Sequence, residues 1–411
     1  MKPGESVLRE ILKPAVIVGA LGYFVDVYDL ILFSIVRRAS LQGLGFSDEK
    51  QLLTLGIHLL NLQMLGMLLG GIAFGILGDR LGRVVLLFGS ILLYSAANIA
   101  NGFVHSIEAY GFWRFVAGFG LAGELGGGIT LVSEVLSKEA RGYGTMIVAT
   151  VGVFGAVVGG LVANLVHWQY AYFIGGGLGL LLLVLRMSVA ESGMFRQMRA
   201  TEMNRGNFLC LFNDWKRFGK YVRCILIGLP LWFVIGILVT FSPEFAGALK
   251  IQGEVSAAHA VAFAYVGITF GGFAGGWFSE QLRSRRKVIL AFILFTLAAM
   301  VAYFFAAGFS SATFYLIILF LGVGVGYWTV FVTVAAEQFG TNIRATVATT
   351  VPNFIRGSVV PLTLAFNFLK LRTGIVSSAA IVGTICILIA LWALRGLDET
   401  HGKELDYIEP I

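Results

Sequence analysis

The chain has 411 residues, of which 57% are hydrophobic and only 13% are charged. So few charged residues cannot coat a water-soluble globule of this size, which excludes a soluble protein. The apolar residues come in blocks of about 20, the length that an α-helix needs to cross the hydrocarbon core of a bilayer. The composition therefore predicts an all-α membrane protein with many spanning helices.

The formal net charge of +7 raises the question of nucleic-acid binding. The basic residues are dispersed over short polar segments, and no DNA- or RNA-binding motif accompanies them. No nucleophile–base pair, metal-ligand spacing or phosphate-binding G-x-x-x-x-G-K-S/T loop stands out either. We expect no enzyme activity, no cofactor, no metal and no nucleic-acid partner, and the three cysteines, Cys210, Cys224 and Cys386, to be free thiols.

Twelve apolar segments are predicted to span the membrane. In chain order they cover about residues 14–37, 52–78, 84–104, 107–136, 143–166, 168–187, 222–245, 257–281, 288–307, 311–338, 345–369 and 374–395. An even number of spans places both termini on one side. If that side is the cytoplasm, 22 of the 30 Lys and Arg residues lie on it and six lie outside, which is the bias that cytoplasmic loops show.

The longest polar stretch divides the spans into two groups of six. We expect an N-terminal lobe at 1–187, a cytoplasmic linker at 188–221, a C-terminal lobe at 222–395 and a cytoplasmic tail at 396–411. The linker is predicted to be either a solvated loop or a segment with short interfacial helices. An internal repeat supports the two lobes: a Glu followed seven residues later by an Arg occurs at Glu134 and Arg141, and again 203 residues later at Glu337 and Arg344.

Three segments resemble the major facilitator superfamily. The loop after the second span, Gly75 to Arg83, is similar to the G-x-x-x-D-R-x-G-R loop of that superfamily. Asp26-Val-Tyr-Asp29 in the first span and Arg114 to Glu124 in the fourth are similar to segments of its metabolite:proton symporters, with Val27 and Ala122 departing from their patterns. The resemblance covers nearly the whole chain and implies the major facilitator fold, with two lobes that rock about a central solute site.

The same resemblance implies a cytoplasmic gate network that forms and breaks as the lobes rock. Its members would be Asp79, Arg80, Arg83, Glu134, Arg141, Glu280, Glu337 and Arg344. The residues alone favour the alternative, static ion pairs or contacts with lipid headgroups.

Ionisable residues also lie inside the predicted spans. Each costs at least about 2.5 kcal/mol near the bilayer centre, so such residues usually face a cavity or one another. Asp26 and Asp29 share a helical face, and Asp29 is expected at the depth of Arg114. We expect one of the two aspartates to carry a proton with Arg114 as its switchable partner, and a permanent ion pair is the alternative. Glu124 is either an inner proton stop or a helix–helix hydrogen bond.

Arg356 lies in the eleventh span, where Pro352 and Pro361 are expected to bend the helix. A cavity that contains Arg114 and Arg356 favours a solute with a carboxylate, because a guanidinium binds that group through two parallel hydrogen bonds. Other aromatic and amide residues are candidates for the solute site, although such residues more often pack or anchor helices: Tyr23, Asn61, Gln63, Trp232, Tyr327, Trp328 and Asn353.

The sequence thus predicts a secondary active transporter, a proton-coupled symporter of a small carboxylate-bearing or zwitterionic metabolite. We expect a monomer surrounded by lipid in a bacterial cytoplasmic membrane, with both termini in the cytoplasm. A proton-independent facilitator or exchanger of the same fold stays open, because carboxylates in the membrane do not prove proton coupling. A transporter-like receptor, which binds the solute without moving it, is a third reading.

Overall fold

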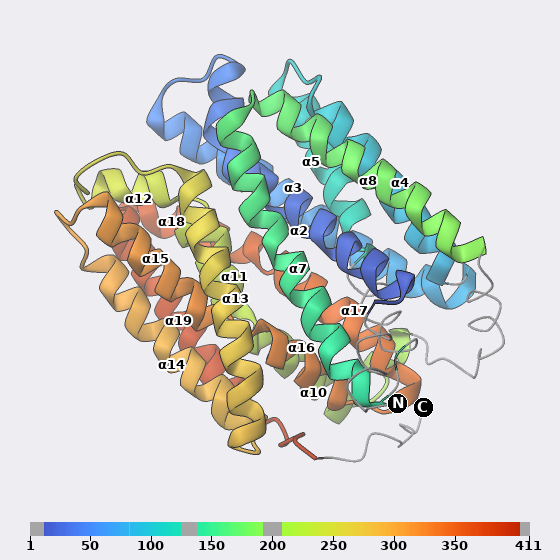
Figure 1. Cartoon of the computed structure of the whole chain (residues 1–411). Coiled ribbons are helices and arrows are strands. Elements are labelled where there is room, and N and C mark those ends of the chain that lie inside the picture. Colours follow the sequence, from blue (N-terminus) through green and yellow to red (C-terminus); the bar gives the residue numbers. More distant parts are fainter. Residues whose placement is uncertain (1–11, 82, 125–135, 137, 192–207, 403–411) are drawn as a thin grey trace.

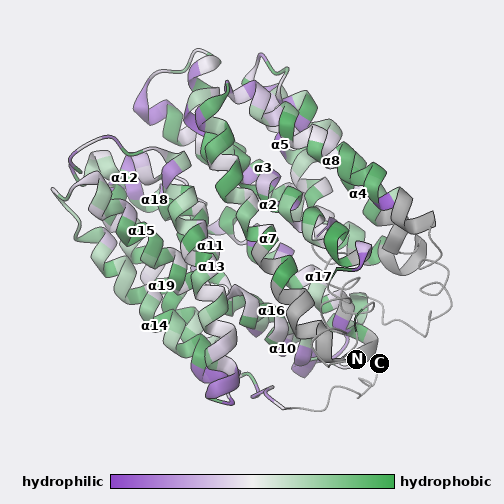
Figure 2. Ribbon diagram, viewed as in Figure 1, coloured by the Kyte–Doolittle hydropathy of each residue, from purple (hydrophilic) through white to green (hydrophobic). Residues whose placement is uncertain are grey.

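The computed structural model describes residues 12–81, 83–124, 136, 138–191 and 208–402, and over these residues the chain is helical without any β-strand. Long helices run side by side through the molecule (Figure 1). Hydrophobic residues cover their lengths and hydrophilic residues gather toward their ends (Figure 2). Large apolar side chains such as Val184 and Leu388 are more than half exposed, at 60% and 61%. Nine helices in this part are long and apolar enough to cross a membrane.

The first half of the chain forms helices that coincide with the first six predicted spans. They are α2 (Pro14–Gly43), α3 (Glu49–Leu81), α4 (Arg83–Asn101), α5 (Ile107–Leu121), α7 (Lys138–Leu165) and α8 (Trp168–Glu191). Helix α2 packs chiefly against α7 and α8, α3 against α5, and α4 against α5 and α8. Residues 125–135 of the fourth predicted span lie outside the described residues.

The second half contains the other six predicted spans, three of which are divided into consecutive helices. The helices are η1 (Phe208–Phe212), α10 (Trp215–Ile227), α11 (Leu229–Phe233), η2 (Val234–Val239), α12 (Ser242–Ala248), α13 (Ala257–Gln281), α14 (Arg285–Phe304), α15 (Ser311–Val325), α16 (Trp328–Glu337), α17 (Thr341–Gly357), α18 (Val359–Thr373) and α19 (Ile375–Arg395). Helix α17 ends at Gly357 and α18 begins at Val359, so the helix is interrupted between Pro352 and Pro361, just after Arg356.

Serine caps explain where several of these helices begin. The hydroxyl of the serine just before the first turn accepts a hydrogen bond from the backbone N–H three residues later, which satisfies one of the free donors of that turn. This occurs at α5, α13, α14 and α15, with Ser106, Ser256, Ser284 and Ser310 as the caps. The three cysteines are free and buried, as expected.

The two halves repeat one packing device. Gly66 and Gly118 bring α3 and α5 so close that a Cβ at either position would overlap a backbone carbonyl of the other helix. Gly267 and Gly322 do the same for α13 and α15. The first members of these pairs are 201 residues apart and the second members 204, so the repeat seen in the loops is also present in the packing. Such close backbone approach stabilises helix pairs in lipid, where no hydrophobic force drives association.

The halves meet along α2, α3 and α7 of the first half and α13, α17 and α18 of the second. The start of α2 and the end of α19 lie at one end of the bundle, here called the proximal end (Figure 1). The loop at residues 44–48 and helix α12 lie at the opposite, distal end.

Three boundaries differ from the prediction. Helix α2 continues to Gly43, past the predicted end of the first span at 37, so Arg37 and Arg38, two of the six basic residues assigned to the outside, are helical residues. Helix α8 continues to Glu191, past the predicted end of the sixth span at 187, so Arg186, one of the 22 basic residues assigned to the cytoplasmic side, is a buried helical residue. Helix α10 begins at Trp215, inside the predicted linker, because Asp214 caps its first turn by accepting from the N–H of Arg217.

A carboxylate from the segment after α19 fixes the proximal end of α14. Glu399 accepts hydrogen bonds from the Ser284 hydroxyl at 2.5 Å and from the backbone N–H groups of Arg285 at 2.9 Å and Arg286 at 3.3 Å. Burial pushes the pKa of Glu399 up, but the hydrogen bonds outweigh it and lower the pKa to about 2 from an ordinary 4.5. The ionised carboxylate therefore stabilises the folded chain.

Replacement of Gly118 by Ala should lower stability by about 1–3 kcal/mol, because the added methyl overlaps the backbone of α3. Gly89→Ala is the matched control, since Gly89 lies in α4 with open space around it. Thermal unfolding of the purified protein in detergent measures both variants. Equal shifts in their midpoints would show that close packing of α3 and α5 is not needed.

Glu399→Gln should destabilise the protein in a pH-dependent way. A lowered pKa means that the contribution of the carboxylate is complete above about pH 4.5 and is lost as the pH falls through about 2. The difference in unfolding temperature between wild type and variant should therefore be constant from pH 7 to pH 5 and roughly halved near pH 3. A difference that stays unchanged down to pH 3 would refute the assignment.

Candidate functional site

One face of α2 carries a series of buried charges at helical spacing. Asp26, Asp29 and Arg37 each have a completely buried side chain. A charge in such surroundings is costly unless an opposite charge or hydrogen bonds compensate it. Each of the three therefore identifies the place where another helix has to provide a compensating group.

Asp26 is paired across the interface between the two halves. Its Oδ2 atom lies 3.6 Å from a guanidinium nitrogen of Arg356, in the last turn of α17. This separation is that of an ion pair but is too long for a hydrogen bond, and neither Asp26 oxygen has a hydrogen-bond partner among the described residues. The Arg356 guanidinium also lies 6.0 Å from the centre of the Trp232 ring, and its Nε atom has no partner in the described chain.

Several predicted solute-site residues make hydrogen bonds that cross the same interface. The indole N–H of Trp328 donates to the Tyr23 hydroxyl at 3.3 Å. The amide of Asn353 donates to the carbonyl of Ala122 at 2.9 Å. Asn61 accepts from the hydroxyl of Thr363 at 2.6 Å. The structure thus brings Tyr23, Asn61, Trp232, Trp328, Asn353 and Arg356 to one interface.

Two other predicted residues bond within their own half. The amide of Gln63 donates to the carbonyl of Leu30 at 3.0 Å, which joins α3 to α2. The hydroxyl of Tyr327 donates to the carbonyl of Ile227 at 2.8 Å. These contacts are those of helix packing, the alternative that the sequence left open.

Asp29 and Arg114 are neighbours without a direct bond. The charge of Arg114 acts on Asp29, but no ion pair joins them in the described chain. The guanidinium lies over the rings of Phe33 and Tyr172, 5.1 Å and 5.6 Å from their centres, and its nitrogens have no hydrogen-bond partner among described residues. Gly175 of α8 leaves the space for Asp29, because a Cβ there would overlap Oδ1. The direct partner of an aspartate on α2 is therefore Arg356, where the sequence analysis expected Arg114.

A chain of hydroxyl groups leads from this region toward the distal end. The Tyr110 hydroxyl lies 2.6 Å from that of Tyr172 and donates to Ser40 at 3.1 Å, and Ser40 donates to the carbonyl of Arg37. All of these residues are completely buried. Sequence reasoning missed Tyr110 and Tyr172, since a tyrosine in an apolar helix resembles any interfacial aromatic residue.

Glu124 forms a two-point ion pair with Arg186 of α8. One nitrogen of Arg186 donates to Oε2 at 3.0 Å and the other donates to Oε1, with both side chains buried. Gly22 of α2 gives this pair its space. Sequence reasoning missed Arg186, although three of the next four residues, Met187, Val189 and Ala190, are apolar and indicate that the span continues.

The predicted cytoplasmic gate is described only in part. Glu134 and the side chains of Asp79, Arg80, Arg83 and Arg141 lie outside the described residues. The others bond within the second half: Glu337 pairs with Arg285 at 2.8 Å, Glu280 lies 3.4 Å from His401, and Arg344 donates to two carbonyls near its own helix. These contacts of Glu337, Glu280 and Arg344 thus lie within the second half.

The sequence profile of the Major Facilitator Superfamily matches residues 19–359. A Bacillus subtilis (strain 168) protein, provisionally named niacin/nicotinamide transporter NiaP, is 27% identical over 393 residues, which is 90% of this chain and 94% of that protein. Niacin transporter NiaP of Acinetobacter baylyi is 26% identical over 331 residues, 70% of this chain and 72% of the other.

The fold is similarly shared with solved structures. The D-xylose–proton symporter superposes with a TM-score of 0.69 at 17% identity, covering 95% of this chain and 99% of that one. The expected fold is thereby confirmed, and so is the expectation that the protein is no enzyme, because the matched family consists of transporters. The chain belongs to the major facilitator superfamily and is a multi-pass membrane transporter of small molecules.

Proposed function

We propose that the protein is a proton-coupled symporter of a small carboxylate-bearing metabolite. The observation that carries this proposal is the pair of Asp26 and Arg356, two buried opposite charges that come from different halves. At a separation of 3.6 Å, Asp26 makes no hydrogen bond to Arg356. The guanidinium of Arg356 can therefore form hydrogen bonds with the carboxylate of a solute. The aromatic and amide groups around it, Tyr23, Trp232, Trp328, Asn353 and Asn61, are the assigned solute contacts.

The coupling follows from competition for Arg356. A solute carboxylate that binds the guanidinium through two hydrogen bonds replaces Asp26 as its counter-charge. Asp26 is then an unpaired carboxylate in a buried place, and taking up a proton removes that penalty. Solute and proton therefore bind together, and the loaded site contains no uncompensated charge when the halves move.

Asp29 and Arg114 are the assigned second proton site, inside the first half. Both side chains are buried, and the Asp29 carboxylate and the Arg114 guanidinium make no hydrogen bonds within the described chain. A proton that binds Asp29 therefore removes the negative charge that lies near Arg114. Glu124 is assigned a structural role, because its two-point bond with Arg186 leaves no free oxygen.

The relatives support both parts of the proposal. Two of them are named for niacin transport, and niacin is a pyridine ring that carries a carboxylate. A protein that shares the fold is a symporter of D-xylose and protons. A proton-independent exchanger of the same fold is the alternative, and the response to a pH gradient distinguishes the two.

The arrangement in the membrane is also part of the proposal. We assign 1–187 and 222–395 as the two six-helix lobes, 188–221 as the cytoplasmic linker and 396–411 as the cytoplasmic tail. The charge bias of the loops supports cytoplasmic termini, which makes the proximal end the inner end and the distal end the outer one. We assign the protein to a bacterial cytoplasmic membrane, where it acts as a monomer.

Nicotinate and nicotinamide provide a matched pair of ligands for the carboxylate requirement. Nicotinate should raise the unfolding temperature of the purified protein, whereas nicotinamide should have little effect, because only nicotinate offers a carboxylate to Arg356. Arg356→Gln should weaken nicotinate binding about 10–100-fold, as expected for a lost charged hydrogen bond. Equal binding of both ligands, measured by calorimetry, would contradict a carboxylate site.

Asp26→Asn should abolish accumulation driven by a pH gradient while solute exchange continues, since the variant binds solute but no proton at this position. Uptake of labelled nicotinate into proteoliposomes, with and without a gradient, separates the two activities. Glu108→Gln is the matched control, because Glu108 is an exposed acid at the start of α5. Full accumulation by Asp26→Asn would exclude Asp26 as the coupling group.

A further inference from the structure

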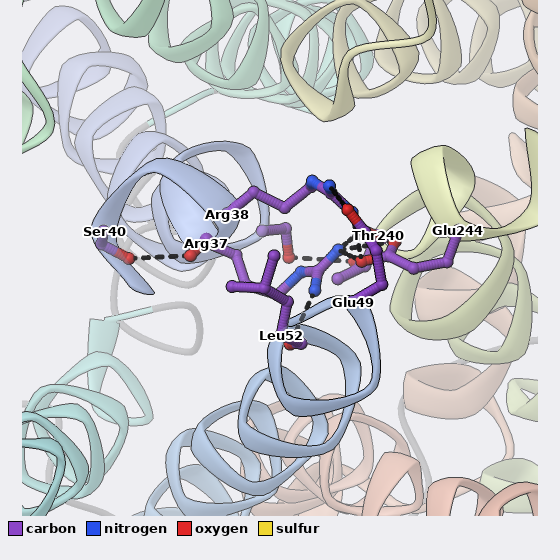
Figure 3. A network of polar contacts seen from close by, with 8 residues as sticks. Arg37, Arg38, Ser40, Glu49, Leu52, Thr240 and Glu244 are labelled. Atoms are coloured by element: carbon purple, nitrogen blue, oxygen red, sulfur yellow. Dashed lines mark hydrogen bonds and ion pairs between the residues drawn. The ribbon is translucent and has the colours of Figure 1, made fainter. Parts of the chain in front are cut away.

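A second set of ionic contacts joins the halves at the distal end of the bundle (Figure 3). Arg37 donates from one guanidinium nitrogen to both oxygens of Glu244, each at 2.7 Å. Arg38 donates to Glu49 at 2.8 and 2.5 Å and to Glu244 at 3.2 Å. Arg37, Arg38 and Glu49 belong to the first half, on α2 and α3, whereas Glu244 belongs to α12 of the second.

The Arg37–Glu244 pair is shielded from solvent. The side chain of Arg37 is 0% exposed and that of Glu244 6%. The guanidinium lies 4.5 Å from the centre of the Phe241 ring and donates further to the carbonyls of Leu52 and Thr240. Breaking a buried pair without replacing a partner is strongly unfavourable, because it leaves an uncompensated charge away from water. The pair therefore holds the halves together as long as water is excluded.

A neutral bond one turn deeper strengthens the same closure. The Thr240 hydroxyl of the second half donates to Ser34 of α2 at 2.9 Å, and both residues are buried. By contrast, the gate residues described at the proximal end bond within the second half. Ion pairs that join the halves are thus found at Asp26, which pairs with Arg356, and at Glu244, which pairs with Arg37 and Arg38.

We propose that Arg37 and Glu244 form a latch that closes the distal end, and that its rupture is the step that opens the solute path there. The inference rests on the proposed transport by rocking halves, in which the distal end is the outer one. When the halves separate, Arg37 keeps the Leu52 carbonyl and Arg38 keeps Glu49, while Glu244 loses both arginines. Glu244 is therefore the residue whose charge controls closure.

Accessibility of a cysteine at position 34 tests the latch. Ser34→Cys is introduced into a chain whose three native cysteines are replaced by alanine, and a membrane-impermeant maleimide is added in the absence of solute and pH gradient. Glu244→Gln should accelerate labelling at least about tenfold, since Arg37 loses its counter-charge in the closed state. Glu49→Gln, which removes an acid bonded to Arg38 within the first half, should change the rate less than about twofold.

Further variants make the result decisive. The Arg37→Gln and Glu244→Gln double variant should label more slowly than either single variant, because no unpaired charge is left in the closed state. If Glu244→Gln does not fold, Glu244→Asp takes its place and should also accelerate labelling, because its carboxylate is drawn back by one methylene. Labelling equal to the parent, or equal acceleration by Glu49→Gln, overturns the latch. The labelling needs no substrate, so it is independent of whether the proposed solute and proton coupling are right.

Discussion

Charges that are buried in a helix bundle need partners, and this requirement governs how the two halves of the protein are placed. Helix α2 carries Asp26, Asp29 and Arg37 on its buried surface. An unpaired charge at such a place costs several kcal/mol, more than most single packing contacts return. Because Asp26 and Arg37 have their partners in the second half, the position of that half is tied to α2 at two depths.

The ion pairs differ in ways that separate fixed contacts from exchangeable ones. Glu124 and Arg186 lie within one half and make a two-point hydrogen-bonded pair, which is the geometry of a fixed contact. Asp26 and Arg356 are joined by charge alone at 3.6 Å. A carboxylate that forms hydrogen bonds to Arg356 has an advantage over Asp26, which is what a binding site for an anionic solute requires.

Packing within each half and packing between the halves have different physical characters. Glycines bring α3 onto α5 and α13 onto α15 with backbone contact, and this dispersion-dominated packing is lost steeply when helices separate. The interface between the halves contains hydrogen bonds that Tyr23 and Asn61 accept and one that Asn353 donates. Hydrogen bonds between the halves can be replaced by hydrogen bonds to a solute or to water. The interface between the halves is therefore the part of the fold that can open.

The sequence alone determined the apolar segments, the repeat of about 200 residues, the family and most of the residues at the central interface. These follow from local signals: length in a bilayer, spacing on a helix and loop motifs. Only the tertiary structure decided which charges meet, pairing Asp26 with Arg356 and burying Arg37 and Arg186, which lie at the ends of predicted spans and had been counted with the loop charges. The physical reason is that helical periodicity fixes which residues share a face, whereas the rotation and tilt of each helix against its neighbours fix what that face touches.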